Sequence, residues 1–72
     1  MTFEEFSDLV NLSPKPEHLR PGQYAWGMLH THNLDLGIQI MQMRDVDPFY
    51  DDECLPAFWD WLKENWDNKI VK

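Results

Sequence analysis

Five carboxylates lie within nine residues of the chain, and they form its densest group of side chains able to do chemistry: Asp45, Asp47, Asp51, Asp52 and Glu53. Carboxylate oxygens are the ligands that a hard cation such as Ca²⁺ prefers. The spacing begins like that of an EF-hand loop, but Tyr50 stands where the loop needs glycine and Pro56 where it needs its bidentate glutamate. We therefore favour a structural interpretation and expect no bound metal. In it, Asp47 makes a turn and residues 51 to 53 cap the helix that follows.

The two central histidines do not form a metal site by their spacing. His30 and His32 are two residues apart, so on a helix their side chains point about 200° apart and cannot ligate one ion together. We expect His32 at the edge of the core, with a ring nitrogen bonded to the backbone.

Nucleophilic chemistry is also disfavoured. A reactive Cys54 would need a lowered thiol pKa, which the neighbouring acidic residues oppose. The sequence has no Ser-His-Asp set, glycine-rich phosphate loop or pair of catalytic carboxylates. We also expect a chain of 72 residues to have little room for a substrate pocket of about 300 Å³ or more. The prediction is a protein without catalytic residues or cofactor.

The tryptophans suggest binding instead. On the helix predicted near the C-terminus, Trp61 points about 200° away from the apolar side chain of Trp59. Trp61 and Trp26 are therefore candidates for an exposed aromatic patch of the kind found at protein interfaces. The alternatives are that the chain folds over Trp61 or that the protein dimerises through it. The predicted partner-binding residues are Trp26, His30, Asp51, Asp52 and Trp61.

The elements that must position these residues are predicted to be helices. Thr2 and Glu5 form a capping box for a first helix, Pro21 suits the first turn of a second, and Asp47-Pro48 makes a turn before the last. Apolar side chains recur at helical spacing, most clearly over 55 to 66, at Leu55, Phe58, Trp59, Leu62 and Trp66. We predict an all-α fold, a compact bundle of three to four short helices at about 3–12, 21–31, 34–43 and 54–67, in a single domain over 1–72. The last residues, 70 to 72, are expected to fray.

The segment from Leu34 to Ile40 is open to two interpretations. Its apolar residues alternate as in a half-buried strand, but no other segment alternates well enough to pair with it. Asn33 is a good N-cap and the composition favours a helix. We therefore predict a mostly buried helix, with Gly37 allowing another helix to approach. Phe49 and Tyr50 are expected to fold back onto the helix junction.

Several short motifs in this sequence resemble a known group. They are Arg20-Pro21-Gly22-Gln23, Leu29-His30, Asp47-Pro48-Phe49-Tyr50-Asp51-Asp52, Pro56-Ala57-Phe58, Trp61-Leu62 and Asn65-Trp66. The pattern is similar to that of a widespread group of small phage- and prophage-encoded proteins. Between His30 and Asp47 the sequence departs from the group, with Met41-Gln42-Met43 in place of a basic and a small residue. The resemblance implies a phage context and brings no catalytic residue with it.

Charge limits the partners. Thirteen acidic against six basic residues give a net charge of −7, which repels phosphate backbones and anionic membrane surfaces. The single cysteine, the acidic N-terminal segment and the lack of a long apolar run lead us to expect a cytoplasmic protein, in the host cytosol if phage-encoded.

Three functions remain open. The first is an interaction module that modulates or inhibits a host protein, or binds a phage protein, with a basic partner favoured by charge. The second is a DNA mimic that occupies a nucleic-acid-binding protein. The third is a small assembly protein that forms a homodimer or a larger homo-oligomer.

Overall fold

The computed structural model describes residues 1–66, and this part of the chain is helical without strands. Its elements are α1 (Phe3–Leu12), α2 (Pro21–His32), α3 (Leu34–Ile40), the short 3-10 helix η1 (Asp52–Cys54) and α4 (Leu55–Asn65). The predicted all-α bundle of short helices is confirmed, including the helical interpretation of residues 34 to 40. The predicted end of the last helix at 67 and the fraying tail lie outside the described residues.

The third helix ends earlier than predicted, at Ile40 instead of residue 43. The reason is a change of hydrogen-bond pattern. The amides of Gln42 and Met43 donate to the carbonyls of Gln39 and Ile40, three residues back. Such tighter bonds satisfy the last carbonyls of a helix while ending it. Residues 41 to 51 then form turns that lead to η1.

Local sequence signals set the other helix ends. In α1, the Glu5 amide donates to the Thr2 hydroxyl at 3.1 Å and the Thr2 amide to the Glu5 carboxylate at 2.8 Å, which is the predicted capping box. Pro21 is the first residue of α2. The Asn33 side chain accepts from the Leu36 amide at 3.3 Å and caps α3. These caps form because each helix starts with amides that have no partner inside the helix.

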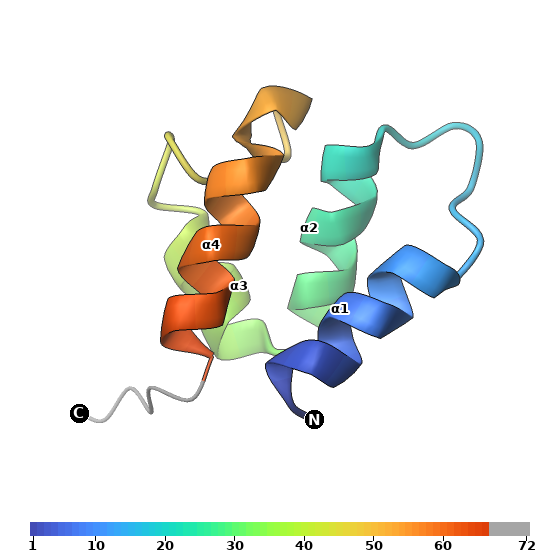
Figure 1. Cartoon of the computed structure of the whole chain (residues 1–72). Coiled ribbons are helices and arrows are strands. Elements are labelled where there is room, and N and C mark those ends of the chain that lie inside the picture. The colour runs from blue at the N-terminus through green and yellow to red at the C-terminus, as the bar shows by residue number, and fades with distance from the viewer. Residues whose placement is uncertain (67–72) are drawn as a thin grey trace.

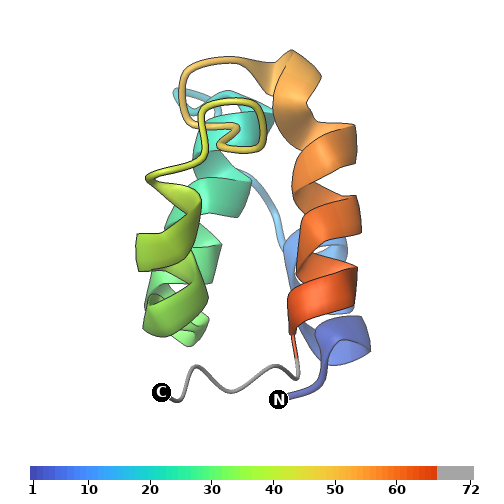
Figure 2. The same ribbon diagram turned by 90° about the vertical axis from the view of Figure 1, so that its left-hand side faces the viewer.

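The chain folds so that two groups of loops lie at opposite ends of the bundle. Helices α2 and α3 form an antiparallel hairpin, α4 runs alongside it, and α1 crosses the end at which the N-terminus lies (Figures 1 and 2). The start of α2, the loop 41–51 and η1 gather at the other end. This second end brings together most of the motif residues noted in the sequence.

The core lies between all four helices. Its buried side chains are Phe6, Val10, Ala25, Leu29, Leu36, Ile40, Phe58, Leu62 and Trp66. Phe6 and Trp66 stack with ring centroids 5.1 Å apart, and the Trp66 indole donates to the Met1 carbonyl at 2.9 Å. Burial of these aromatic rings supplies the large apolar area that a small chain needs for stability.

His32 lies at the edge of the core, as predicted, but its ring forms no hydrogen bond to the backbone within residues 1–66. It is exposed, and its ring contacts the edge of Phe6 at a centroid distance of 6.5 Å.

Candidate functional site

The carboxylate of Asp52 joins the loop end of the bundle to the start of α2. Its Oδ1 accepts from the Gly22 amide at 2.9 Å and from Arg20 Nη1 at 2.9 Å. The other terminal nitrogen of Arg20 donates to the Phe49 carbonyl. A carboxylate at this position satisfies a free amide of α2 and complements the positive end of the helix dipole. Asp52 thus caps α2, thirty residues away in sequence, and not the last helix as predicted.

Gly22 allows the loop to lie this close to α2. A Cβ atom at this position would lie 2.2 Å from the Pro48 carbonyl oxygen and 2.7 Å from Asp52 Oδ1. Both distances are far inside van der Waals contact, and the nearer atom belongs to the backbone. Only glycine fits without moving the loop.

The other two aspartates of the motif fix local turns. Asp47 is buried, and its Oδ1 accepts from the Phe49 amide at 2.9 Å across Pro48. Asp51 accepts from the Glu53 amide at 2.9 Å and caps η1. The predicted turn at Asp47 is confirmed, and so is the predicted cap in the case of Asp51.

A row of four rings crosses from the loop to α2. The ring centroids of Tyr50 and Phe49 are 4.8 Å apart, those of Phe49 and Trp26 are 4.7 Å apart, and those of Trp26 and His30 are 4.0 Å apart. The row ends against α3, where a Cβ at Gly37 would lie 2.9 Å from the His30 ring. Gly37 therefore permits the close approach of α2 that we predicted.

The prediction for Tyr50 is wrong, although that for Phe49 is right. Phe49 folds back onto Trp26, but Tyr50 stays 81% exposed. Residues 48 to 50 form a turn and a bend, and the Tyr50 ring reaches only the outer side of Phe49, at a centroid distance of 4.8 Å.

Trp26 and His30 contribute two buried polar atoms to this row. His30 Nδ1 lies 2.9 Å from the Trp26 carbonyl oxygen, to which it donates as the Nδ1–H tautomer. Trp26 Nε1 and His30 Nε2 have no hydrogen-bond partner within residues 1–66. Both residues are partly buried, and the Phe49 ring of the loop packs against Trp26.

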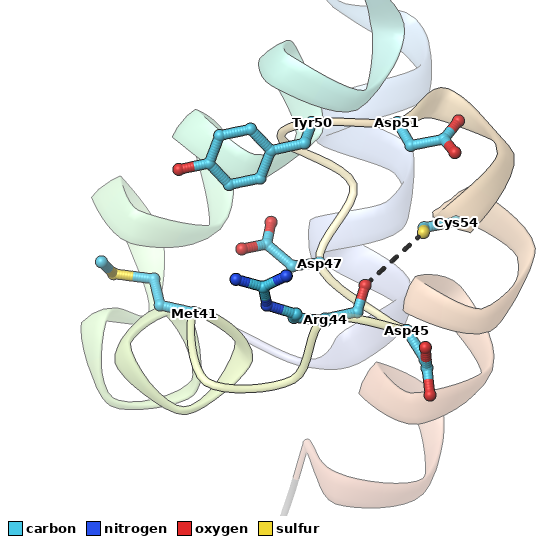
Figure 3. A pocket seen from close by; sticks show the side chains of 7 residues that line it. All are labelled: Met41, Arg44, Asp45, Asp47, Tyr50, Asp51 and Cys54. Atoms are coloured by element: carbon cyan, nitrogen blue, oxygen red, sulfur yellow. Dashed lines mark hydrogen bonds between the residues drawn. The ribbon is translucent and has the colours of Figure 1, made fainter.

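A pocket of about 630 Å³ opens beside the loop. Its lining residues are Met41, Arg44, Asp45, Asp47, Tyr50, Asp51 and Cys54. Figure 3 shows the side chains of Arg44 and Asp47 turned toward each other, whereas the carboxylates of Asp45 and Asp51 point away from them. The expectation that so small a chain has little room for a pocket of this size is wrong, because the pocket forms between the turns of a long loop.

Cys54 lies at the edge of this pocket as a thiol. Its Sγ donates to the Arg44 carbonyl at 3.8 Å (Figure 3). Desolvation, followed by the charges of Asp51, Asp45, Asp47 and Glu53, raises the pKa of Cys54 above its ordinary value. The arrangement opposes a reactive thiolate at neutral pH, in the direction expected from the sequence.

Helix α3 exposes an apolar face that we did not predict. Leu34, Ile38 and Met41 are 56%, 49% and 55% exposed. They lie at i, i+4 and i+7, and so share one side of the helix. Only the opposite side, with Leu36, Gly37 and Ile40, is buried. We call Leu34, Ile38, Met41 and Tyr50 the apolar surface, since Tyr50 is also exposed and lines the same pocket as Met41.

The predicted partner-binding residues divide between these regions. Asp51 lines the pocket, Trp26 and His30 lie under the loop, and Asp52 is held by Arg20 and Gly22. Trp61 is on α4, where it is partly buried and packs against the core. A missed signal was the apolar periodicity of residues 34 to 41, which has more large side chains than one buried helix face can hold.

Two observations concern other kinds of site. No three His, Cys, Asp or Glu side chains in residues 1–66 are grouped so that they could hold a metal ion. Over the same range, no helix is long and apolar enough to cross a membrane.

Comparison with protein-family models, curated protein sequences and solved structures finds no match to this chain. The functional argument therefore rests on the surface, the pocket and the charges described above.

Proposed function

We propose that the protein is a non-enzymatic interaction module that binds a partner protein through the apolar surface and the acidic pocket beside it. The observation that carries the proposal is the exposed stripe of Leu34, Ile38 and Met41, together with the exposed Tyr50, which lines the same pocket as Met41. Isolated apolar residues are common on protein surfaces, but a contiguous row next to a pocket is typical of binding sites.

Charge supports a basic partner. The protein carries a net charge of −7, and Asp35, Asp45 and Asp51 are exposed on the same elements as the apolar surface. A partner with apolar side chains flanked by lysine or arginine matches this surface in both respects. The negative charge also speeds the encounter with such a partner.

The biological setting of the proposal comes from the resemblance of the sequence motifs to small phage- and prophage-encoded proteins. In that setting the partner is a protein of the bacterial host, which the module modulates or inhibits in the cytosol. The raised pKa of Cys54 is consistent with a non-enzymatic role, because it keeps the thiol at the pocket protonated.

Affinity capture followed by direct binding measurements tests the proposal. The tagged protein is used to capture partners from a bacterial host lysate, and each partner is then purified and titrated by calorimetry. We expect one basic protein to bind directly. The double variant Ile38→Ser, Met41→Ser should bind at least about tenfold more weakly, since two apolar contacts are lost.

Leu12→Ser is the matched control. Leu12 is 81% exposed but lies on α1, outside the apolar surface, so this variant should bind as the unchanged protein does. Equal weakening by both variants, or by neither, contradicts the proposal.

The unchanged protein, the double variant and the captured partner also distinguish this function from a DNA mimic and from a homo-oligomer. Binding that is unaffected by the double variant, but falls steeply with salt and involves a nucleic-acid-binding protein, would instead indicate a DNA mimic. Self-association in sedimentation that the double variant abolishes would instead indicate a homo-oligomer.

A further inference from the structure

We infer that the partner protein contributes one amphipathic helix with basic flanks, and that this helix lies along the outer side of the α2–α3 hairpin, against Leu34, Ile38 and Met41. The inference rests on the proposed function and deepens it, because it names the structural class of the partner's binding element and the side of the hairpin on which it lies.

Helical spacing places the exposed stripe beside α2. Gly37 lies where the two helices meet, since a Cβ there would be 2.9 Å from the His30 ring. Leu34 comes three residues before Gly37 and Met41 four residues after it, so both lie next to this contact along α3. Because both are exposed, they lie on its solvent side. The stripe therefore borders α2 and faces away from the core.

The neighbouring side of α2 leaves room for another helix. Gly27 and Thr31 lie on the side of α2 that is opposite to the buried Leu29. A Cβ at Gly27 would meet nothing within 4 Å. The Thr31 hydroxyl already donates to the Gly27 carbonyl at 3.0 Å. Because the distance between packed helices depends on the side chains at their contact, these small side chains let a second helix come close.

The form of this surface favours a helix as the partner's element. Residues 1–66 contain no strand, so this part of the chain has no sheet edge to which a partner strand could add. The stripe extends from i to i+7, which is about 10 Å along a helix axis. Two turns of a helix with apolar residues at i, i+3, i+4 and i+7 present a row of matching length.

Charge favours basic flanks on that helix. Asp35 is exposed, three residues before Ile38, and its carboxylate forms no hydrogen bond or ion pair within residues 1–66. A lysine or arginine beside the apolar row of the partner therefore meets an opposite charge. A second copy of the chain would instead bring its own net charge of −7 to this surface. Repulsion between the two copies disfavours self-association there.

The test uses a designed peptide and the full chain. The probe is a capped peptide of leucine and lysine, about 18 residues long, with leucines at helical spacing on one face. One control peptide has the same composition in an order without an apolar face, and another has glutamate in place of lysine. Each is titrated into the isotope-labelled protein and followed by NMR. We expect saturable amide shifts at residues 27 to 42 with the probe, and binding at least about tenfold weaker with either control.

Gly27→Arg assigns the position of the bound helix. Arginine is a good helix former and residue 27 has open space, so α2 stays folded. Its long cationic side chain should weaken the basic probe at least about tenfold. Leu12→Arg makes the same change of charge on α1, outside the hairpin, and should change binding less than about twofold. Unchanged amide shifts of α4 show that each variant is folded.

Several results would overturn the inference: no saturable shift with the probe, equal binding of either control peptide, or equal effects of the two arginine variants. The captured partner separates this inference from the proposed function. A partner that is weakened by Ile38→Ser, Met41→Ser but not by Gly27→Arg retains the proposed function and overturns the inference. A partner that is unaffected by the double variant overturns the proposed function itself.

Discussion

The two sides of the loop between α3 and α4 use the same residue types in opposite ways. On the inner side, Asp52 is held by Arg20 and by the Gly22 amide, and Phe49 packs on Trp26. On the outer side, Asp51 and Arg44 form no ion pair within residues 1–66, and Tyr50 is exposed. The inner side holds the bundle together, whereas the outer side leaves charge and apolar surface free for a partner.

The difference lies in what each side chain already contacts. Asp52 accepts one hydrogen bond from the Gly22 amide of α2 and one from the Arg20 side chain just before it. It therefore stabilises the fold and has little capacity left to bind a ligand. Asp51 accepts only one hydrogen bond, from the Glu53 amide. It therefore contributes less to the stability of the fold, and its second oxygen can accept a hydrogen bond from a partner. Stability and binding should therefore respond to different substitutions within one short loop.

The largest effect is expected where the inner side allows no extra atom. Gly22→Ala should lower the free energy of unfolding by about 3 kcal/mol, because its Cβ would overlap the Pro48 carbonyl and displace Asp52. Chemical denaturation measures this change. Gly27→Ala in the same helix is the control. Its Cβ would meet nothing within 4 Å, so it should stabilise by about 0.5 kcal/mol. Similar changes in the free energy of unfolding for the two variants would contradict the close packing of the loop against Gly22.

The second effect tests the cap from Asp52. Asp52→Ala should cost about 1.5 kcal/mol of stability, mainly through the lost bond to the Gly22 amide. The ion pair with Arg20 contributes less, since both side chains are about two-fifths exposed, at 42% and 38%. Asp51→Ala, which removes only the cap of η1, should cost about 0.5 kcal/mol. A larger loss of stability for Asp51→Ala than for Asp52→Ala would show that the cap on η1 stabilises the fold more than the cap on α2 does.

The outer side should tolerate change. Ile38→Ser and Met41→Ser should each alter the free energy of unfolding by less than about 0.5 kcal/mol, because both side chains are half exposed. Thermal unfolding followed by circular dichroism measures it. A loss above about 2 kcal/mol would identify the apolar surface as part of the folding core.

The smallest effect concerns the thiol at the pocket. Because the pKa of Cys54 is raised, the folded state favours the protonated thiol. Its contribution to stability is present below the ordinary thiol pKa and is lost as pH rises through the raised value. Alkylation in the folded protein should reach half its maximal rate at a higher pH than in urea. Asp51→Asn, which keeps the cap, should move this midpoint downward. A midpoint equal to that in urea would contradict the assignment.

Local signals made most of the helices predictable. Thr2, Pro21 and Asn33 mark the starts of three helices through bonds or restraints that span at most three residues. The spacing of Phe58, Leu62 and Trp66 likewise identified the buried face of α4.

The contacts between the loop and the start of α2 were not predictable from local signals. The contact of Gly22 with Pro48 and Asp52 spans about thirty residues, and no local pattern distinguishes a tertiary cap from an ordinary one. The apolar face of α3 was misjudged for a related reason. Periodicity indicates how apolar a helix is, but the number of neighbouring helices decides how many of its sides are buried.

The hydrogen bond from the Trp66 indole to the Met1 carbonyl joins residues 65 positions apart. It closes a loop over nearly all of the described chain, and the rings of Phe3 and Phe6 pack against Trp66 at the same place. Opening either α1 or α4 therefore exposes the same aromatic cluster. Native-state hydrogen exchange should give the amides of these two helices one common opening free energy.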